Sequence, residues 1–162
     1  MGTKNLTLLM VFFFLFSGSS AVSAEIKGMA WVIDGDTIVV NHQKIRLFGI
    51  DAPEISQICA DNTQMGRKAK TALIKLVKGR TVSCTGGQID SYGRIIAQCF
   101  VYFTNQEYID ISAKLVQNGM AFAYRKYSKI YIHNENIAKN KNIGIWEREC
   151  MKPETFRRES VY

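Results

Sequence analysis

The stretch from residue 32 to residue 54 constrains the fold of this 162-residue chain more than any other segment. It contains two apolar runs, residues 38–40 and 45–50, whose β-branched and aromatic side chains are typical of buried strands. The polar residues 41–44 between them predict a turn. The two runs are therefore expected to form a hairpin, and its open end brings together the side chains that flank the runs.

Carboxylates flank both runs. Asp34, Asp36, Asp51 and Glu54 stand near the strand ends, and closure of the hairpin is expected to bring Asp36 and Asp51 together. Several anions at one point require a cation, and clustered carboxylate oxygens suit Ca²⁺ or Mg²⁺. Arg46, on the second strand, is a candidate phosphate clamp. The alternative is that Asp-Gly-Asp is only a turn whose side chains bond their own backbone.

The first 24 residues have the pattern of a signal peptide. Lys4 gives a positive start, residues 6–16 form an apolar core, and Val-Ser-Ala at residues 22–24 suits cleavage after a small residue. A membrane anchor is the alternative, but a span needs roughly 20 apolar residues. We therefore predict a secreted or periplasmic protein with no stable membrane anchor after removal of residues 1–24.

The four cysteines fit an exported chain. An even number in an oxidising compartment predicts two disulfides, although four cysteines allow three pairings. We favour Cys84 with Cys99 because they flank residues 86–94, near equivalent positions of two predicted antiparallel strands. Elimination then pairs Cys59 with Cys150. A zinc site is the alternative, but the sequence contains no Cys-x-x-Cys pair.

Periodicity and turn signals predict one α+β domain, mainly β, at residues 25–150, followed by a basic tail at residues 151–162. Residues 86–93 are predicted to be a mobile glycine-rich connection. The predicted strands are residues 27–33, 36–41, 44–50, 80–85 and 94–103, and the predicted helices are residues 63–78, 110–118 and 134–142. This is the element order of the OB-fold, so we expect a five-stranded OB-fold barrel with about three packed helices.

Three motifs occur here in the order and spacing of a known family. They are Asp-Gly-Asp-Thr at residues 34–37, Arg-x-x-x-x-Asp-x-Pro-Glu at residues 46–54 and Asp-x-Tyr-Gly-Arg at residues 90–94. With Leu-Val-Gln-Asn-Gly-Met-Ala at residues 115–121 and Gly-Ile-Trp-Glu at residues 144–147, the chain resembles the staphylococcal-nuclease-like (thermonuclease) family. The resemblance implies the same barrel with helices added. It also implies a calcium-dependent nuclease that cleaves DNA and RNA with low sequence specificity and leaves 3′-phosphate ends.

The resemblance assigns the Ca²⁺ ion to the hairpin carboxylates. Asp36 and Asp51 match the family's Ca²⁺ ligands, together with the main-chain carbonyl of the next residue, Ala52. The best-known member has threonine at that last position. Because the contribution is a backbone oxygen, the change to alanine is expected to be tolerated. Asp34 is expected to support the site without binding the cation itself.

Glu54, Arg46 and Arg94 are the expected catalytic residues. Glu54 matches the family's functional glutamate, and a carboxylate beside a cation can deprotonate water or orient it for attack on phosphorus. Which of the two it does stays open. Arg46 and Arg94 would neutralise the charge that builds on the phosphate oxygens, because planar guanidinium groups form paired hydrogen bonds. The alternatives are structural: an exposed glutamate, a salt bridge and the closure of a hairpin.

Tyr92, Tyr124 and Tyr127 are candidate substrate contacts, through base stacking or a hydrogen bond to a terminal phosphate. Aromatic residues in such a stretch also serve packing, so both roles stay open. The family has a lysine where this chain has Ser91, and the family's paired tyrosines do not align cleanly with Tyr124 and Tyr127. These departures concern substrate affinity and base preference, whereas the reaction is expected to be retained.

The chain is basic, with a formal net charge of +7, of which Lys4 contributes one unit. Such an excess attracts polyanions without identifying them, so nucleic acids, heparin-like sugars and anionic membranes all fit. Two alternatives to the enzyme therefore stay open: a non-catalytic OB-fold module that binds nucleic acid, and a secreted heparin-binding or adhesion protein. His42 and His133 are given no role, and the protein is expected to be a monomer.

Overall fold

The structure of this chain is a computed structural model that describes residues 25–103 and 107–160. The predicted signal peptide, residues 1–24, lies outside the described residues. Within the described ranges, no helix is both long and apolar enough to cross a membrane. The class is mixed α+β, as the sequence predicts.

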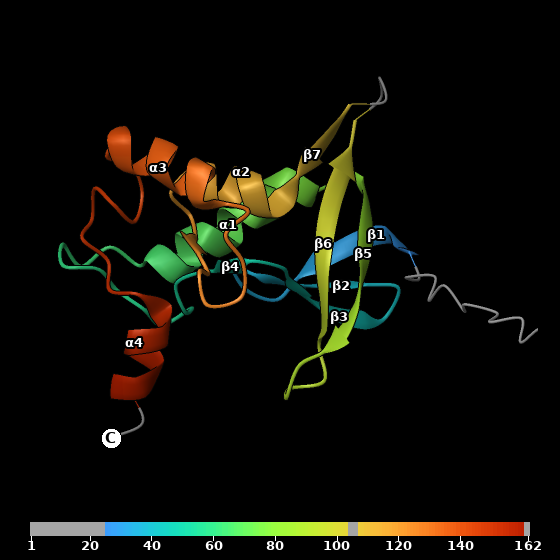
Figure 1. Cartoon of the computed structure of the whole chain (residues 1–162), viewed down its shortest axis with the longest axis horizontal. Helices are drawn as coiled ribbons and strands as arrows, with labels where there is room; N and C mark the ends of the chain where they lie inside the picture. The colour runs from blue at the N-terminus through green and yellow to red at the C-terminus, as the bar shows by residue number, and fades with distance from the viewer. Residues whose placement is uncertain (1–24, 104–106, 161–162) are drawn as a thin grey trace, which may run out of the picture.

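Strand residues outnumber helix residues in the first half of the described chain, and helix residues outnumber strand residues in the second half (Figure 1). In chain order the elements are β1 (Glu25–Val32), β2 (Thr37–Val40), β3 (Gln43–Leu47), β4 (Ile50–Asp51), α1 (Met65–Val77), β5 (Thr81–Ile89), β6 (Ile95–Tyr102), β7 (Tyr108–Asp110), α2 (Ile111–Gln117), β8 (Phe122–Ala123), α3 (Ile132–Asn140) and α4 (Pro153–Glu159). The described residues thus hold four helices, where the sequence predicts about three, and the additional helix is α4.

Five strands close into a ring. Neighbours in the order β3-β2-β1-β5-β6 pair antiparallel, and a parallel pairing of β3 with β6 completes the circle. Closure gives β3 a second partner, which satisfies the backbone groups of an otherwise open edge. β7 continues the sheet beyond β6, and β4 pairs with β8 in a separate two-stranded sheet. The ring thereby sets the β2–β3 hairpin beside β6.

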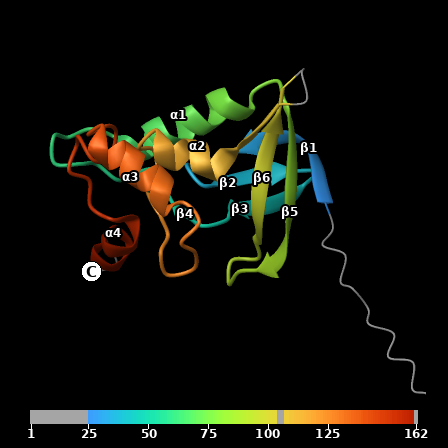
Figure 2. The same ribbon diagram turned by 45° about the horizontal axis from the view of Figure 1, so that its top comes forward.

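The inside of the ring and the inner faces of the helices share one core. Ile38 and Val40 of β2 alternate with outward residues, as do Ile45 and Leu47 of β3, and all four are completely buried. Leu73 of α1 joins the same cluster. Figure 2 shows α1, α2 and α3 gathered beside the strands, with α4 apart from them near the C-terminus. The core therefore fixes both strands of the hairpin from which the predicted site residues project.

β5 is longer than the sequence predicts. In place of a mobile connection over residues 86–93, β5 continues and pairs with β6 across a register shift between Gly86 and Gln88. A close backbone approach explains the glycine, because a Cβ on Gly86 would lie 2.2 Å from the carbonyl oxygen of Ile96. The connection is consequently confined to residues 90–94.

The tail predicted at residues 151–162 contains the helix α4. It begins at Pro153, whose fixed φ suits the first turn of a helix. Pro153 is also buried. With seven residues, α4 is too short to show a helical period in the sequence, which is why the sequence predicts only a tail.

Two disulfides cross-link the described chain. Cys84 and Cys99 are directly opposed on β5 and β6, with their Cα atoms 4.1 Å apart. Cys59 pairs with Cys150 across a sequence separation of 91 residues. These are the pairings expected from the sequence. The zinc alternative is wrong, because no described cysteine is free.

Replacing Cys84 and Cys99 together by alanine is expected to lower the free energy of unfolding by about 3 kcal/mol, since their bridge closes a loop of 15 residues. Urea unfolding of the oxidised proteins, followed by circular dichroism, measures the difference. A thiol assay on the variant confirms that the bridge between Cys59 and Cys150 is intact. An unchanged unfolding midpoint would contradict the expectation.

Candidate active site

A cavity of about 790 Å³ lies over the open end of the β2–β3 hairpin and the turn between β5 and β6. Asp51 lines a second cavity of about 340 Å³, which shares Tyr124 with the first. The other predicted metal, catalytic and substrate residues all line the larger cavity: Asp36, Arg46, Ala52, Glu54, Tyr92, Arg94, Tyr124 and Tyr127. The fold therefore gathers at one place residues that the sequence distributes over separate segments.

Asp36 stands immediately before β2 and is 6% exposed. Its Oδ2 accepts hydrogen bonds from Arg46 Nη1 at 2.9 Å and from the Ala52 backbone nitrogen at 3.2 Å, and its Oδ1 accepts from Thr37 Oγ1 at 3.0 Å. Burial raises the pKa of this carboxyl above its usual value, and Arg46 opposes that shift. The turn alternative describes Asp34, whose Oδ1 accepts from the Asp36 backbone nitrogen at 3.0 Å. The Asp36 carboxylate itself faces Arg46.

Arg46 joins the two predicted metal ligands. Its Nη1 bonds Asp36, and its Nη2 donates to Asp51 Oδ1 at 3.0 Å and to the Ile50 carbonyl at 3.2 Å. Asp51 is 3% exposed. Burial lowers the pKa of Arg46, but the Asp36 and Asp51 carboxylates outweigh that effect and raise it, so the guanidinium stays charged. The phosphate clamp expected from the sequence is thus engaged by two carboxylates, with the Tyr124 ring centroid 5.9 Å away.

Glu54 directly follows the buried Pro53, opens the turn closed by Gln57, and keeps 39% of its side chain exposed. Its Oε1 accepts a hydrogen bond from Arg157 Nη1 at 2.6 Å, and its backbone nitrogen donates to Gln57 Oε1 at 3.1 Å. The start of α1 fixes the backbone, because a Cβ on Gly66 would lie 1.8 Å from the Glu54 carbonyl oxygen. Backbone packing therefore sets where Glu54 stands, and one arginine sets where its carboxylate points.

Arg94 is held at the turn between β5 and β6. Its Nε and Nη2 contact Asp90 Oδ2 at 2.8 and 2.7 Å, and its Nη1 donates to Thr37 Oγ1 at 3.2 Å. Asp90 also accepts bonds from the backbone nitrogens of Arg94 and Tyr92, which shapes the turn. Burial alone would raise the pKa of Asp90, but these bonds to Arg94 and Tyr92 lower it below its usual range. Arg94 consequently reaches across to the start of β2, next to Asp36.

The three predicted substrate tyrosines stand around the cavity. Tyr92 is 80% exposed, and its ring centroid lies 5.2 Å from the guanidinium of Arg94. Tyr124 and Tyr127 contact each other edge to face, with ring centroids 4.9 Å apart. Burial and the nearby Asp51 carboxylate raise the pKa of Tyr124. Tyr124 therefore packs against the charged site, whereas Tyr92 and Tyr127 are largely exposed to solvent.

Arg157 of α4 is the residue that sequence reasoning misses. It donates to Asp51 through both terminal nitrogens, from Nη2 to Oδ2 at 3.0 Å and from Nη1 to Oδ1 at 3.2 Å, and it also bonds Glu54. In the sequence it is one of two neighbouring arginines in a basic tail, a pattern that normally indicates solvated charge. The available signals were Cys150, which ties the tail to the domain, and Pro153, which suits a helix start.

The predicted metal ligands fit a hard cation by donor type. In the part of the chain that the structure describes, no cluster of three or more His, Cys, Asp or Glu side chains forms a ready metal site. The predicted set instead holds two carboxylates and a backbone carbonyl, all hard oxygen donors of the kind that Ca²⁺ prefers. Asp36 and Asp51 both direct an oxygen at one positive group, Arg46. Their meeting point therefore attracts positive charge.

Guanidinium groups beside carboxylates in one cavity suit a phosphate ester, because arginine recognises phosphate oxygens through paired hydrogen bonds. Comparison with known proteins agrees with a site for phosphate esters. Residues 44–148 match the family model described as staphylococcal nuclease homologue. The chain is 35% identical over 156 residues to an endonuclease of Haemophilus influenzae described as uncharacterized, covering 90% of this chain and 81% of that protein. It is 34% identical over 143 residues to a micrococcal nuclease of Shigella flexneri, covering 80% and 78%.

A third relative, the succinoglycan biosynthesis protein ExoI of Rhizobium meliloti, is 29% identical over 141 residues, covering 83% of this chain and 72% of that protein. The matched range and these identities show that the chain belongs to the staphylococcal nuclease family. It is a nuclease, a hydrolase of phosphodiester bonds. The family is generally Ca²⁺-dependent.

Replacing Arg46 by methionine is expected to lower the free energy of unfolding by about 3 kcal/mol, because it leaves two buried carboxylates without their shared partner. Adding Asp36→Asn is expected to recover part of the loss, since the remaining charge is then smaller. Urea unfolding at pH 7 measures both variants. The control is Arg148→Met, which removes a partly exposed ion pair with Asp61 and should change stability far less. Equal effects of the two arginine variants would contradict the role of Arg46.

Proposed function

We propose that this protein is an exported, Ca²⁺-dependent nuclease that hydrolyses DNA and RNA with low sequence specificity and leaves 3′-phosphate ends. The proposal depends on one observation in a chain that matches the nuclease family. Three carboxylates and two arginines meet at the cavity over the β2–β3 hairpin: Asp36, Asp51, Glu54, Arg46 and Arg94. Carboxylates for a cation, a carboxylate for water and guanidinium groups for phosphate are the parts that phosphodiester hydrolysis requires.

The ring of strands is proposed to be an OB-fold barrel. Its five members pair antiparallel except for the parallel closure of β3 with β6, and α1 lies between the third ring strand and the fourth in sequence. OB-folds use the faces and loops of such a barrel to bind oligonucleotides. The cavity over the β2–β3 hairpin and the β5–β6 turn occupies a comparable place.

Asp36, Asp51 and the Ala52 carbonyl are proposed to hold the cation. When bound there, Ca²⁺ would supply positive charge to a phosphate oxygen of the substrate. Asp36 is fixed for this role by Thr37 and by the Ala52 backbone nitrogen. Asp51 is fixed by the pairing of β4 with β8. Hydrogen bonds within the protein thus hold both carboxylates in place, and Arg46 and Arg157 supply those to Asp51.

Glu54 is proposed to direct the attacking water. Its exposed carboxylate accepts a hydrogen bond or a proton from the water, whose oxygen forms the new bond to phosphorus. The bond from phosphorus to the 5′ oxygen breaks, and the departing oxygen takes up a proton from solvent, with Arg94 beside it. Both roles of Glu54, base and positioner, place its carboxylate on the same water. The phosphate then stays on the 3′ end.

Arg46 and Arg94 are proposed to stabilise the transition state. Both residues line the cavity and both meet Thr37: Arg46 lies opposite it in the register of β2 and β3, and Arg94 Nη1 donates a hydrogen bond to its Oγ1. Charge that develops on the equatorial phosphate oxygens strengthens their hydrogen bonds. Each now bonds carboxylates, so the substrate phosphate would share or replace those partners.

The tyrosines are proposed to bind the nucleotides on either side of the phosphate. Tyr92 and Tyr127 expose most of their rings beside the cavity, and base–aromatic stacking tolerates any sequence. The two disulfides support a place outside the cytoplasm, either periplasmic or secreted, and we propose that the protein acts there as a monomer.

Glu54→Gln is expected to reduce turnover on single-stranded DNA by about 100-fold or more, because the amide cannot take a proton from water. The dissociation constant for the same DNA should change by less than about 3-fold, since Glu54 is not proposed to bind the phosphate. Glu107→Gln, at an exposed position away from the cavity lining, is the matched control. Cleavage by the Glu54 variant at the wild-type rate would contradict the mechanism. Binding without cleavage by the wild type would favour the non-catalytic module.

A further inference from the structure

The Glu54 carboxylate depends on a single residue for its orientation. Its side chain is 39% exposed, and such a carboxylate adopts several rotamers unless a partner restrains it. In residues 25–103 and 107–160, the side-chain hydrogen bond of Glu54 is the one from Arg157 Nη1 to Oε1. The group proposed to direct water is therefore aimed by the C-terminal helix.

The geometry of Arg157 suits this task. Its two terminal nitrogens both contact the buried Asp51, and Nη1 reaches Glu54 at the same time. A planar guanidinium can hold two carboxylates in a fixed relation because its donors form a rigid fork. Asp51 is 3% exposed and fixed in β4, so Arg157 transfers the rigidity of that strand to the exposed Glu54.

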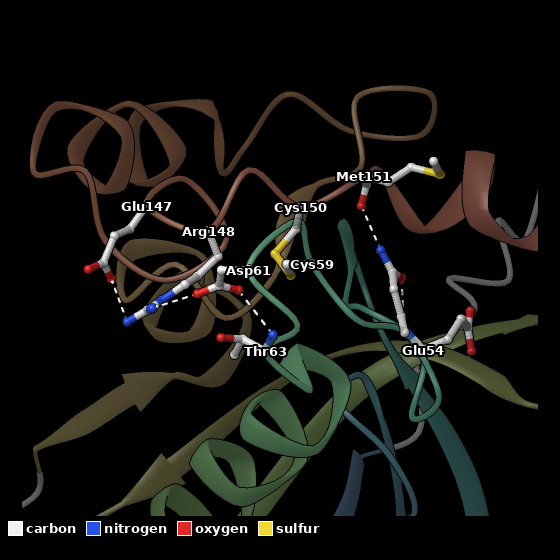
Figure 3. The surroundings of a disulfide bond; sticks show 9 residues. Glu54, Cys59, Asp61, Thr63, Glu147, Arg148, Cys150 and Met151 are labelled. Atoms are coloured by element: carbon white, nitrogen blue, oxygen red, sulfur yellow. Dashed lines mark hydrogen bonds and ion pairs between the residues drawn. A yellow bond between two sulfur atoms is a disulfide. The ribbon is translucent and has the colours of Figure 1, made fainter.

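The segment before α4, residues 148–151, is clamped at three points to the loop that follows Glu54, residues 54–62 (Figure 3). Cys59 and Cys150 form the disulfide, and Arg148 Nη1 bonds Asp61 Oδ2 at 2.7 Å. Gln57, completely buried, links the Glu54 backbone nitrogen to the Met151 carbonyl, which it reaches at 2.7 Å.

These clamps persist over a wide pH range and hold the base of α4 against the loop. The hydrogen bond from Arg148 lowers the pKa of Asp61 to about 2, so the ion pair survives moderate acid. Arg157 also stays charged: burial lowers its pKa, but Asp51 and Glu54 outweigh that effect and raise it. Helix α4 is consequently held against the site with the Arg157 guanidinium charged.

From this arrangement we propose that Arg157 is a positioning residue for the reaction, which holds Glu54 at the angle needed to direct water. The inference rests on the proposed nuclease mechanism and adds the C-terminal helix to the active site. Arg157 lies beyond residues 44–148, the range that matches the family model.

The test compares Arg157→Gln, Arg157→Lys and the exposed neighbour Arg158→Gln in Ca²⁺-dependent hydrolysis of single-stranded DNA. The glutamine variant should lower kcat by about 10-fold or more and change KM by less than about 3-fold, because an interaction that aims Glu54 affects the transition state rather than binding. Lysine should restore part of kcat, since it keeps the charge but lacks the fork. Arg158→Gln should match the wild type. A wild-type kcat in Arg157→Gln would overturn the proposal.

A double-mutant cycle separates positioning from a general effect on the fold. If Arg157 acts through Glu54, adding Arg157→Gln to Glu54→Gln should cost little further activity. An equal loss in both backgrounds would overturn the proposal. Crystal structures of wild type and Arg157→Gln add a readout without turnover: the Glu54 carboxylate should be ordered in the first and displaced in the second. If Glu54 is displaced in Arg157→Gln but the wild type does not cleave DNA, the nuclease mechanism alone is contradicted. If Glu54 stays in place in Arg157→Gln, the positioning role of Arg157 is contradicted.

Discussion

The site depends on the balance between three carboxylates and two guanidinium groups. Asp36 and Asp51 are almost completely buried, and a buried charge is costly unless it is paired and hydrogen-bonded. Arg46 bridges these two, and Arg157 bridges Asp51 to Glu54. The chain thus assembles a cluster of carboxylates beside a cavity, and the guanidinium groups of Arg46 and Arg157 stabilise it. A site built this way is prepared for a hard cation and a phosphate, which introduce further charges of both signs.

The fold makes this cluster possible because the strand register fixes which residues lie opposite each other. In the closed ring, Thr37 lies opposite Arg46, and the parallel pairing of β3 with β6 brings the β5–β6 turn alongside. Arg94 of that turn then reaches Thr37. Short strands inside a closed sheet move little against each other, so the relative positions of these side chains are set by the backbone. The exposed Glu54 is the exception, and it is held by a residue from outside the ring.

Local patterns in the sequence predicted most of what lies within the ring. The β2–β3 hairpin follows from two apolar runs around a turn, and the pairing of Cys84 with Cys99 follows from their places on adjacent strands. The roles of the site residues themselves stay predictions. Arg157 escaped prediction because its contact with Glu54 spans 103 residues, and no periodicity or motif encodes such a contact. The extension of β5 escaped for a different reason: Gly86, which is typical of a loop, here permits a close backbone approach to β6.

The most direct test of this account is digestion of single-stranded DNA by the oxidised protein from residue 25 onward, first with Ca²⁺ and then with a chelator. We predict cleavage that stops when the cation is removed and products that carry 3′-phosphate ends. Salt-sensitive binding without cleavage at any Ca²⁺ concentration would contradict it and leave the carboxylates as structural groups. Equal cleavage in the presence of the chelator would contradict the assignment of Asp36 and Asp51 to the cation.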